Sequence, residues 1–557
     1  MRYFWKKAVM FACVAALLAG CGQSDHSGTV GTEKQDEIVV RGSKVFEGAT
    51  VIELSDEEIT VDGSVISDNA ESAVYAANDI VFYLENQGIA YGEGEEADEH
   101  SKEEADAHTV VHITKPGTYA LSGTLSAGQI AIDLGSDAKE DPEAVVTLIL
   151  NGVDIKCSVA PAVIFYNVYE CGSSDTEGAS KEVDTSAAGA NVLVADGSVN
   201  NVDGAYVARI YNSESVKLSE DGTEVLDAKK LHKYDAAFYS KMTMNVNGDE
   251  LGTGVLNITA TNEGLDSELH LTINGGNINI ISGNDGINTN EDEVSVTTVN
   301  GGTLKIHVSG TTGEGDGIDS NGWLVINGGT VIAEACDKSA DAGIDSDMGI
   351  HINGGMVIAT GNMLDHISES TQNYAVFQFV SSQKAGETYT LKNEAGEVVF
   401  TCKPENDFTY LIVSSEELSA GTYTLWQGDT QLAASQGNMR GGFKGGFGGQ
   451  MPGDMEVPEN MEFPQDGQMP DFEGGERPEG MYRPENGQMP DMQLPEGIEK
   501  PEEIGRPVEG DETAGFGGER PGNGKDFSGM QTDAELSTEI VIVDGGNYFN
   551  NVSAVTK

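Results

Sequence analysis

Short runs in which apolar and polar residues alternate fill most of the chain between about residues 38 and 371. Residues 129–133 and 145–150 are two examples. A period of two is the pattern of a β-strand that turns one face towards a core. Glycine, asparagine and aspartate crowd the gaps between the runs, which is typical of tight turns. No amphipathic helical stretch of convincing length occurs, so the sequence predicts an all-β protein.

The tripeptide Asn-Gly-Gly recurs at a nearly constant interval. It begins at Asn274, Asn300, Asn327 and Asn353, in steps of 26, 27 and 26 residues. Each copy has an apolar residue directly before the asparagine and two more at four and six positions after it. This pattern predicts two short strands joined by a turn in every repeat. The asparagines would stack into a ladder, and glycine would take the left-handed conformation.

A second marker accompanies the turn, with an apolar residue followed by Asp or Asn and then Ser or Thr. Its copies begin at Gly264, Gly286, Gly317 and Gly343. A repeat with about three short strands cannot bury its apolar face alone, whereas stacked copies can, at a strand spacing of ~4.8 Å. Propeller blades need ~40 or more residues, and leucine-rich repeats have helical returns. The sequence therefore predicts a right-handed parallel β-helix.

The composition divides the chain into six predicted parts. These are a lipoprotein signal peptide at 1–20, a tether at 21–37, the parallel β-helix carbohydrate-binding domain at 38–371, a β-rich continuation or cap at 372–436, a disordered segment at 437–537 and a returning terminal strand at 538–557. The long segment is predicted to be a disordered loop because glycine, proline, methionine and glutamate dominate it without a regular period.

The N-terminus predicts export and a lipid anchor. Arg2, Lys6 and Lys7 precede an apolar run that ends in Leu18-Ala19-Gly20-Cys21. That run is too short for a permanent membrane span, which needs about 20 apolar residues. We expect cleavage before Cys21, lipidation of its thiol, and a bacterial lipoprotein on the extracellular face of the membrane, held there by the anchor only. An ordinary secretory signal with an incidental cysteine is the alternative.

The charge balance narrows the choice of partners. Lys plus Arg is 31 and Asp plus Glu is 92, which gives a net charge of −61. A field of this sign repels nucleic acid and attracts cations, so no nucleic-acid partner is expected. We expect a monomer.

Four cysteines follow the predicted signal peptide and anchor: Cys157, Cys171, Cys336 and Cys402. Their spacing matches no zinc-binding pattern. A Cys157–Cys171 disulfide and buried free thiols both remain open.

Acidic residues gather at one corner of the predicted rung. Asp266, Asn288, Asp319 and Asp345 hold equivalent positions and would lie one strand spacing apart. Stacked carboxylates repel unless a cation lies between them, and Ca²⁺ accepts six to eight oxygens. The predicted calcium ligands are Asp266, Asp285, Asn288, Asp316, Asp319, Asp341, Asp345 and Asp347, with Glu263 as an extra candidate. The alternative is a column of turn residues that faces water and binds nothing.

Sugar recognition and catalysis need other side chains. Sugar rings stack on exposed aromatic rings, and Trp323, Phe238 and Tyr239 are the candidates, with core packing as the alternative for each. A calcium-dependent lyase would need a Lys or Arg as base. The repeat region contains few basic residues, and its Lys305 alternates with inward apolar neighbours, so it is expected to point outward. No catalytic residue is predicted.

Several motifs together resemble a known family. They are Ile-Thr-Lys-Pro-Gly-Thr-Tyr at 113–119, Leu-Ser-Gly at 121–123, the strand at 148–155, the Asp-Gly-Ile and Asn-Gly-Gly rungs, and the Gly/Pro/Met-rich insertion before a last strand. In this order they resemble the carbohydrate-binding domain family of bacterial surface proteins, over roughly residues 105–557. The resemblance implies a calcium-containing parallel β-helix, similar in fold to pectate-type lyases, that binds cellulose-like and acidic plant polysaccharides.

The same resemblance implies which residues hold calcium. By position they would be Asp266, Asp285, Asp316, Asp319, Asp341 and Asp345. The chain departs from the regular pattern at Asn288, at the acidic insertion 291–293 and at 156–235, which leaves the number of calcium sites open. We therefore expect a non-catalytic, calcium-dependent polysaccharide-binding surface lipoprotein. A calcium-dependent pectate-type lyase and an adhesin or structural surface protein are the alternatives.

Overall fold

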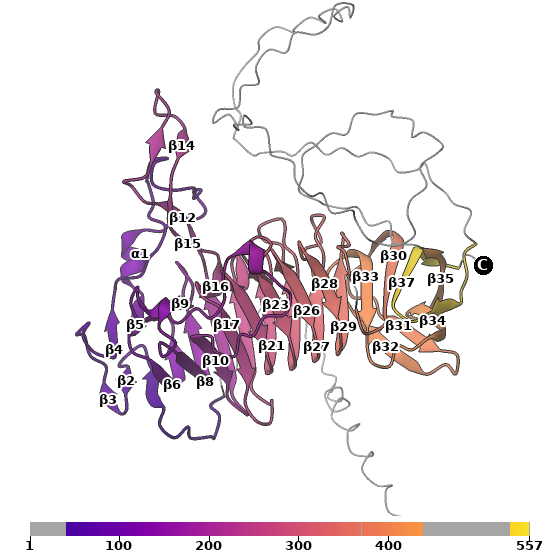
Figure 1. Cartoon of the computed structure of the whole chain (residues 1–557), viewed down its shortest axis with the longest axis horizontal. Coiled ribbons are helices and arrows are strands. Elements are labelled where there is room, and N and C mark those ends of the chain that lie inside the picture. The colour runs from indigo at the N-terminus through magenta and orange to yellow at the C-terminus, as the bar shows by residue number, and fades with distance from the viewer. Residues whose placement is uncertain (1–39, 369, 438–534, 556–557) are drawn as a thin grey trace, which may run out of the picture. The chain divides into compact units, whose positions relative to one another are not determined.

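A computed structural model describes residues 40–368, 370–437 and 535–555 (Figure 1). In these residues the protein is built almost entirely of β-strands, which confirms the all-β prediction. The described helices are α1 (Lys102–Asp106) and the 3-10 turns Ala138–Glu140 and Thr176–Gly178. None of the described helices has the length and apolar character needed to cross a membrane. The predicted signal peptide, the lipid anchor Cys21, the tether and nearly all of 437–537 lie outside the described residues.

Most strands belong to three ladders in which successive repeats pair in parallel. The first ladder contains β6 (Gly117–Leu125), β8 (Val146–Lys156), β10 (Ala190–Val194), β17 (Met244–Gly248), β20 (His270–Ile273), β23 (Val296–Val299), β26 (Trp323–Ile326) and β28 (Gly349–Ile352). The second contains the ends of β6 and β8, then β11 (Val199–Gly204), β18 (Val255–Ala260), β21 (Asn277–Ser282), β24 (Thr303–Val308), β27 (Thr330–Glu334) and β29 (Met356–Gly361).

The third ladder contains β5 (Thr109–Ile113), β7 (Gly128–Asp133), β9 (Val163–Asn167), β16 (Ala236–Ser240), β19 (Glu263–Ser267), β22 (Ile287–Thr289) and β25 (Ile318–Ser320). β4 (Val74–Ala77) closes this ladder by antiparallel pairing with β5. From β9 to β27 each repeat thus contributes one strand to each ladder, in the order third, first, second.

The apolar rows of the repeat pack in register. Ile278 pairs with Leu304, and Leu304 pairs with Val331 in the next rung. All three side chains are fully buried. The predicted equivalence of these positions is therefore confirmed, and the reason is that a one-residue slip would move every apolar side chain to the solvent face.

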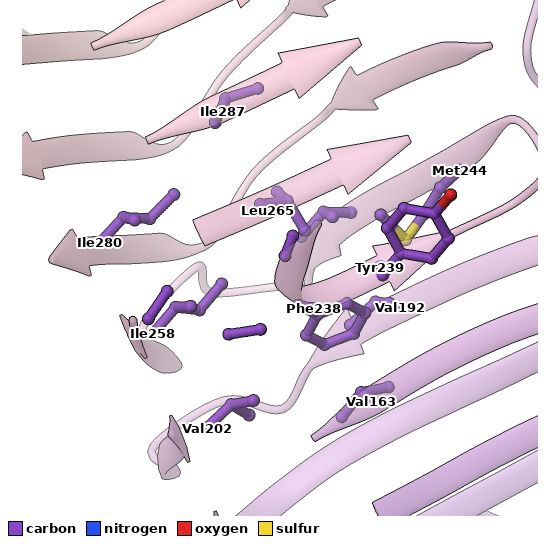
Figure 2. Packing of buried hydrophobic residues seen from close by; sticks show 14 of the residues in the cluster. Val163, Val192, Val202, Phe238, Tyr239, Met244, Ile258, Leu265, Ile280 and Ile287 are labelled. Atoms are coloured by element: carbon purple, nitrogen blue, oxygen red, sulfur yellow. The ribbon is translucent and has the colours of Figure 1, made fainter. Parts of the chain in front are cut away.

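The core is formed where side chains of different ladders meet. Phe238 pairs with Leu265 and Leu265 with Ile287 along the third ladder, and all three are fully buried. Figure 2 shows them together with Ile258 and Ile280, which come from the second ladder. One continuous apolar cluster runs through the stacked repeats.

The asparagine ladder is confirmed. Asn300 donates from Nδ2 to Asn274 Oδ1 at 2.9 Å, Asn327 donates to Asn300 at 3.0 Å, and Asn353 donates to Asn327 at 3.0 Å. At the first of these turns Asn274 donates to Asn247 Oδ1 at 3.0 Å. One amide per rung therefore stacks along the outside of the turns between the first and second ladders.

The second glycine of each Asn-Gly-Gly turn is left-handed, with φ of +93°, +83°, +82° and +80° at Gly276, Gly302, Gly329 and Gly355. A Cβ at Gly302 would lie 2.5 Å from the Gly276 carbonyl oxygen of the neighbouring rung. The turn thus requires glycine both for its backbone conformation and for the close approach of two rungs.

Gly302→Ala is expected to lower the free energy of unfolding by about 2–3 kcal/mol, because backbone strain and a backbone clash act together. Gly396→Ala is the matched control, since Gly396 also has a positive φ of +78° but nothing lies within 4 Å of its added Cβ. The control is expected to cost only about 1 kcal/mol. Urea unfolding measures both variants, and equal losses would show that the approach of the rungs costs nothing.

Additional strands flank the ladders at both ends. On the N-terminal side are β1 (Thr50–Leu54), β2 (Thr60–Val61) and β3 (Ser64–Val65). On the C-terminal side are β30 (Tyr374–Gln383), β31 (Tyr389–Asn393), β32 (Val398–Cys402), β33 (Phe408–Ser414), β34 (Gly421–Gln427), β35 (Thr430–Gly437), β36 (Ile540–Ile542) and β37 (Gly546–Ala554). β33 pairs antiparallel with β29 and so covers the edge of the second ladder. β37 pairs with β30 and β35.

An insertion interrupts the repeat between β11 and β16. It contains the antiparallel pairs β12 (Val207–Tyr211) with β15 (Lys230–Tyr234) and β13 (Lys217–Leu218) with β14 (Val225–Asp227). Its last residues lie against the third ladder, where the Tyr234 and Tyr239 rings are 5.4 Å apart. Cys157, Cys171, Cys336 and Cys402 are free thiols here, and a Cys157–Cys171 disulfide is not formed.

Candidate metal site on the third ladder

The register of the third ladder brings the predicted acidic residues of successive rungs together. Asp266 pairs with Asn288, and Asn288 pairs with Asp319. The backbone of the next rung continues the stack, since Asp345 N donates to Ile318 O at 2.7 Å. Four of the predicted calcium ligands thus form the column that the repeat indicated.

A second column lies three residues earlier in each rung. Gly264 N donates to Asp285 O, and Gly286 N donates to Asp316 O, each at 3.0 Å, so Glu263, Asp285 and Asp316 occupy neighbouring rungs. We call the two columns together the carboxylate corner. Its members are Glu263, Asp266, Asp285, Asn288, Asp316, Asp319 and Asp345.

Two members of the carboxylate corner, Glu263 and Asp266, form a buried cluster of three acids with the neighbouring Asp235. Carboxylate oxygens of Asp235, Glu263 and Asp266 all lie within 4.8 Å of one another. Lys233 Nζ contacts Asp235 Oδ2 at 2.6 Å. Asn288 Nδ2 donates to Glu263 Oε1 at 3.3 Å. Three carboxylates therefore share a small volume with one ammonium group, which neutralises only part of their charge.

Three oxygens in this cluster and on the adjoining Asn288 have no hydrogen-bond donor. They are Glu263 Oε2, Asp266 Oδ2 and Asn288 Oδ1, all buried. A buried polar atom without a partner costs free energy, more so if it is charged. Ca²⁺ is a hard cation that binds carboxylate and amide oxygens in flexible geometry. The donor set therefore fits calcium, and Glu263, Asp266 and Asn288 are the residues that would hold the ion, with Asp235 beside them.

The pKa values of the acids in the carboxylate corner are raised, as expected where several carboxyl groups are buried close together without a cation. Burial raises the pKa of Glu263 and of Asp266 well above the ordinary range, and neighbouring carboxylates add to the shift. Burial likewise raises the pKa of Asp285 and Asp316, again with nearby acids contributing. The pKa of Asp345 rises to about 8, first through burial and then through Asp365 and Asp319. Without a cation, these groups resist being ionised together at neutral pH.

In metal-free protein the melting temperature is expected to fall as pH rises from about 5 to about 8.5. A carboxyl whose pKa is higher in the folded than in the unfolded state stabilises the fold below the unfolded value, about 3.9 for Asp. That stabilisation is lost as pH rises through the folded-state pKa. The pKa of Asp345, about 8, places its share of this loss in the upper part of that pH range.

Saturating calcium is expected to reverse this slope, because the ion binds the ionised ligands. Melting curves between pH 4.5 and 8.5, with chelator in one series and calcium in the other, measure both slopes. The same downward slope in both series would argue against a metal at the corner.

Other predicted ligands have structural partners. Asp285 Oδ1 accepts from Asp316 N at 2.6 Å, and Asp316 Oδ1 accepts from Ala342 N. Asp341 Oδ2 accepts from Gly315 N at 2.7 Å. One oxygen of each therefore links neighbouring rungs by accepting from a backbone N–H, a role that needs no ion. Asp347 is exposed and lies outside the three-acid cluster.

Two of the aromatic sugar-binding predictions are wrong. Phe238 and Tyr239 are fully buried, so neither ring can stack on a sugar. Phe238 belongs to the core, and the insertion covers Tyr239, whose hydroxyl donates to Lys233 O at 3.2 Å. Trp323 is partly exposed at the start of β26, and its role in sugar binding stays a prediction. Lys305 is exposed, as its alternation predicted.

Asp235 and Lys233 were not anticipated as members of the site. Asp235 stands three residues before the inward Phe238, as Asp341 stands three before Ile344, and this spacing is the signal that could have identified it. Lys233 belongs to the insertion, outside the repeat, and no spacing in the sequence connects it with Asp266.

Comparison with known proteins gives a family match and one distant structure. The family model described as "Carbohydrate-binding domain-containing protein" matches residues 107–393, just over half of the 557 residues. A solved structure, that of the polysaccharide lyase-like protein from C. thermocellum (gadolinium derivative), is 19% identical with a TM-score of 0.29. The match covers 55% of this chain and 92% of that one. A TM-score this low does not establish a common fold. No curated protein matches the chain.

Proposed function

Because the chain belongs to the carbohydrate-binding domain-containing protein family, we propose that it is a non-catalytic, calcium-dependent polysaccharide-binding protein. The family match supports the carbohydrate ligand. The single observation that carries the metal is the buried cluster in which Glu263 Oε2, Asp266 Oδ2 and Asn288 Oδ1 lack donors. The ligand would be a plant cell-wall or acidic glycan.

We infer that the three ladders form a right-handed parallel β-helix. In-register parallel pairing from rung to rung, such as Leu265 with Ile287 and Ile287 with Ile318, supports this arrangement. Each rung then contacts only its neighbours, which is how repeat proteins build a continuous core. The outer faces of the ladders are left as long surfaces on which an extended polymer can lie.

Bound calcium would supply positive charge to an otherwise acidic surface. Asp266 and Glu263 would hold it from one rung and Asn288 from the next, so that binding also fastens two rungs together. In a chain of net charge −61, an acidic glycan is repelled by the bare surface. Neutralising the carboxylate corner removes part of that repulsion, which is why binding of uronates is expected to depend on calcium.

A calcium-dependent lyase is the second candidate function, and Lys233 is the residue that could favour it. Its Nζ contacts Asp235 at the edge of the cluster, where a lyase would need a base. Burial lowers the pKa of Lys233, but the charge and hydrogen bond of Asp235 outweigh burial and raise it above the ordinary value. A lysine held protonated is a poor base, so binding without catalysis is the function we favour.

We further propose that the protein is a monomer on the extracellular face of the cell membrane, anchored through a lipid on Cys21. The small-residue pattern Leu18-Ala19-Gly20-Cys21 supports the anchor. Radiolabelled lipid precursor should be incorporated into the natural chain and not into a Cys21→Ala variant.

A depletion assay tests the proposed binding. The protein is mixed with insoluble cellulose or with calcium-free polygalacturonate on beads, in calcium or in chelator, and the unbound fraction is measured. The affinity of the protein for polygalacturonate is expected to be at least about tenfold higher in calcium than in chelator. Loss of one metal contact, at about 1.4 kcal/mol, accounts for a factor of this size. Failure of every glycan to bind in calcium would refute the function. Ultraviolet-absorbing unsaturated ends released from polygalacturonate would establish a lyase instead.

A further inference from the structure

A polar groove crosses the outer face of the first ladder, away from the acids of the third. Its volume is about 430 Å³. The floor consists of Asn245, Thr272, Thr298 and Val325 together with the asparagine ladder, and residues 181–186 form a wall. The proposed calcium ligands are not among the residues that line it.

The floor of the groove repeats once per rung. Asn245 pairs with Thr272, Thr272 with Thr298, and Thr298 with Val325. Side chains at paired positions project from the same face of a parallel ladder, one strand spacing of ~4.8 Å apart. The groove therefore presents a row of small side chains at a fixed interval, across the strands.

The asparagine ladder leaves hydrogen-bonding capacity for a ligand at the same interval. A side-chain amide has two N–H donors and two acceptor lone pairs. Asn300 uses one donor to Asn274 at 2.9 Å and one lone pair for Asn327 at 3.0 Å. One donor and one acceptor of each internal amide thus remain for the groove, and Asn274, Asn300 and Asn327 are exposed.

The wall is fixed to the floor and leaves one buried acceptor open. Thr185 Oγ1 donates to Thr272 Oγ1 at 2.8 Å, and Asn245 Nδ2 donates to Thr185 O at 2.8 Å. Asn245 is only 4% exposed, and its Oδ1 has no hydrogen-bond partner. An acceptor oxygen without a donor suits a hydroxyl group, which can donate to it.

The charges of the groove select against an acidic ligand. Lys181 is ion-paired with Glu182 at 3.3 Å, and Asp184 adds a second carboxylate to the lining. Neither a basic cluster nor the three-acid cluster faces this lining. An anionic sugar would meet repulsion, whereas hydroxyl groups match the amides and threonines.

We infer that this groove binds a neutral, extended polysaccharide chain that runs across the strands, and that this binding does not require calcium. The inference rests on the proposed polysaccharide-binding function and adds to it a separate site for neutral chains that works without calcium. Hydroxyl groups that recur along the polymer would lie against the side-chain amides that recur along the asparagine ladder. The groove and the carboxylate corner then serve neutral and acidic glycans separately.

The test uses cellohexaose, a neutral extended glucan, with calorimetric titration in calcium and in chelator. The groove variant is Asn300→Ala with Asn327→Ala. The matched control is Asn257→Ala with Asn279→Ala, because Asn279 donates to Asn257 Oδ1 at 2.9 Å in a second asparagine ladder on β18 and β21, outside the groove. The groove variant is expected to bind at least about tenfold more weakly, and the control to bind normally, with or without calcium.

A third variant, Thr298→Glu, keeps the test independent of the ladder's stability. Thr298 lies on the groove floor, and the substitution adds bulk and charge without removing an asparagine. It is expected to weaken cellohexaose binding and to leave calcium-dependent binding of polygalacturonate unchanged. Normal cellohexaose binding by both groove variants, or loss of cellohexaose binding in chelator, would overturn the inference while the proposed function stands. If the natural protein binds no glycan at all, the proposed function fails first.

Discussion

Replacing Glu263 with Gln and Asp266 with Asn together is expected to weaken calcium binding at least about 100-fold. The affinity of a calcium site follows the number of charged oxygens, and each factor of ten corresponds to about 1.4 kcal/mol. Both side chains keep their size, so the packing of β19 is preserved. The carboxylates removed are two of the three that lie within 4.8 Å of one another.

Calorimetric titration of calcium into stripped protein measures the affinity, and thermal melts measure its effect on stability. Calcium at 100 times the natural protein's dissociation constant should stabilise the natural protein by about 2.7 kcal/mol and the double variant by no more than about 0.4 kcal/mol. Glu394→Gln is the control, because this exposed glutamate lies outside the carboxylate corner. Equal calcium affinity in all three proteins would assign the ion to other residues.

The same double variant separates a metal site from an ordinary structural cluster. In chelator at pH 8 it should be as stable as the natural protein or more so, because the amides remove charges that are costly to bury without a partner. A structural cluster held by hydrogen bonds alone would instead be weakened in chelator and in calcium alike. Whether the double variant is more or less stable than the natural protein in chelator is therefore as informative as its calcium affinity.

Phe238→Ala is expected to lower the free energy of unfolding by about 3–5 kcal/mol, the range for removing a large buried side chain. Phe238 is fully buried and pairs with Leu265 and Val163 in the neighbouring rungs. The cavity would lie between ladders, where the rigid stack of backbones limits collapse. Urea unfolding measures the loss.

Trp323→Ala is the comparison for this variant. Because Trp323 is partly exposed, its replacement should lower the free energy of unfolding by less than half as much. The folded fraction of Phe238→Ala should bind glycans with unchanged affinity, since the ring does not reach the surface. Weaker binding without a loss of stability would restore Phe238 as a sugar contact.

The two proposed sites arise from one feature of the repeat. A residue that recurs once per rung becomes a column when rungs stack, so its chemistry is multiplied along the ladder. Asn274, Asn300 and Asn327 satisfy one another because amides both donate and accept. Ionised aspartates in the same arrangement only accept, and for this reason we propose a cation at the carboxylate corner and none at the asparagine ladder.

The sequence by itself determined the features that depend on neighbouring rungs. The pairing of Ile278 with Leu304, the stacking of Asn300 on Asn274 and the column from Asp266 to Asn288 were all predictable. The physical reason is that the repeat interval fixes which residues are stacked, and alternation fixes which of them face inward. The left-handed glycine at Gly302 follows from the same turn.

Only the tertiary structure decided what the insertion between β11 and β16 covers. Its path covers Tyr239 and brings Lys233 to Asp235, although nothing in the repeat specifies where an inserted segment packs. The groove has the same origin, because residues 181–186 dock on the first ladder through Thr185 and Thr272. Periodicity determines contacts between equivalent positions, whereas a segment outside the period is placed by the surface that it can bury and the hydrogen bonds that it can form.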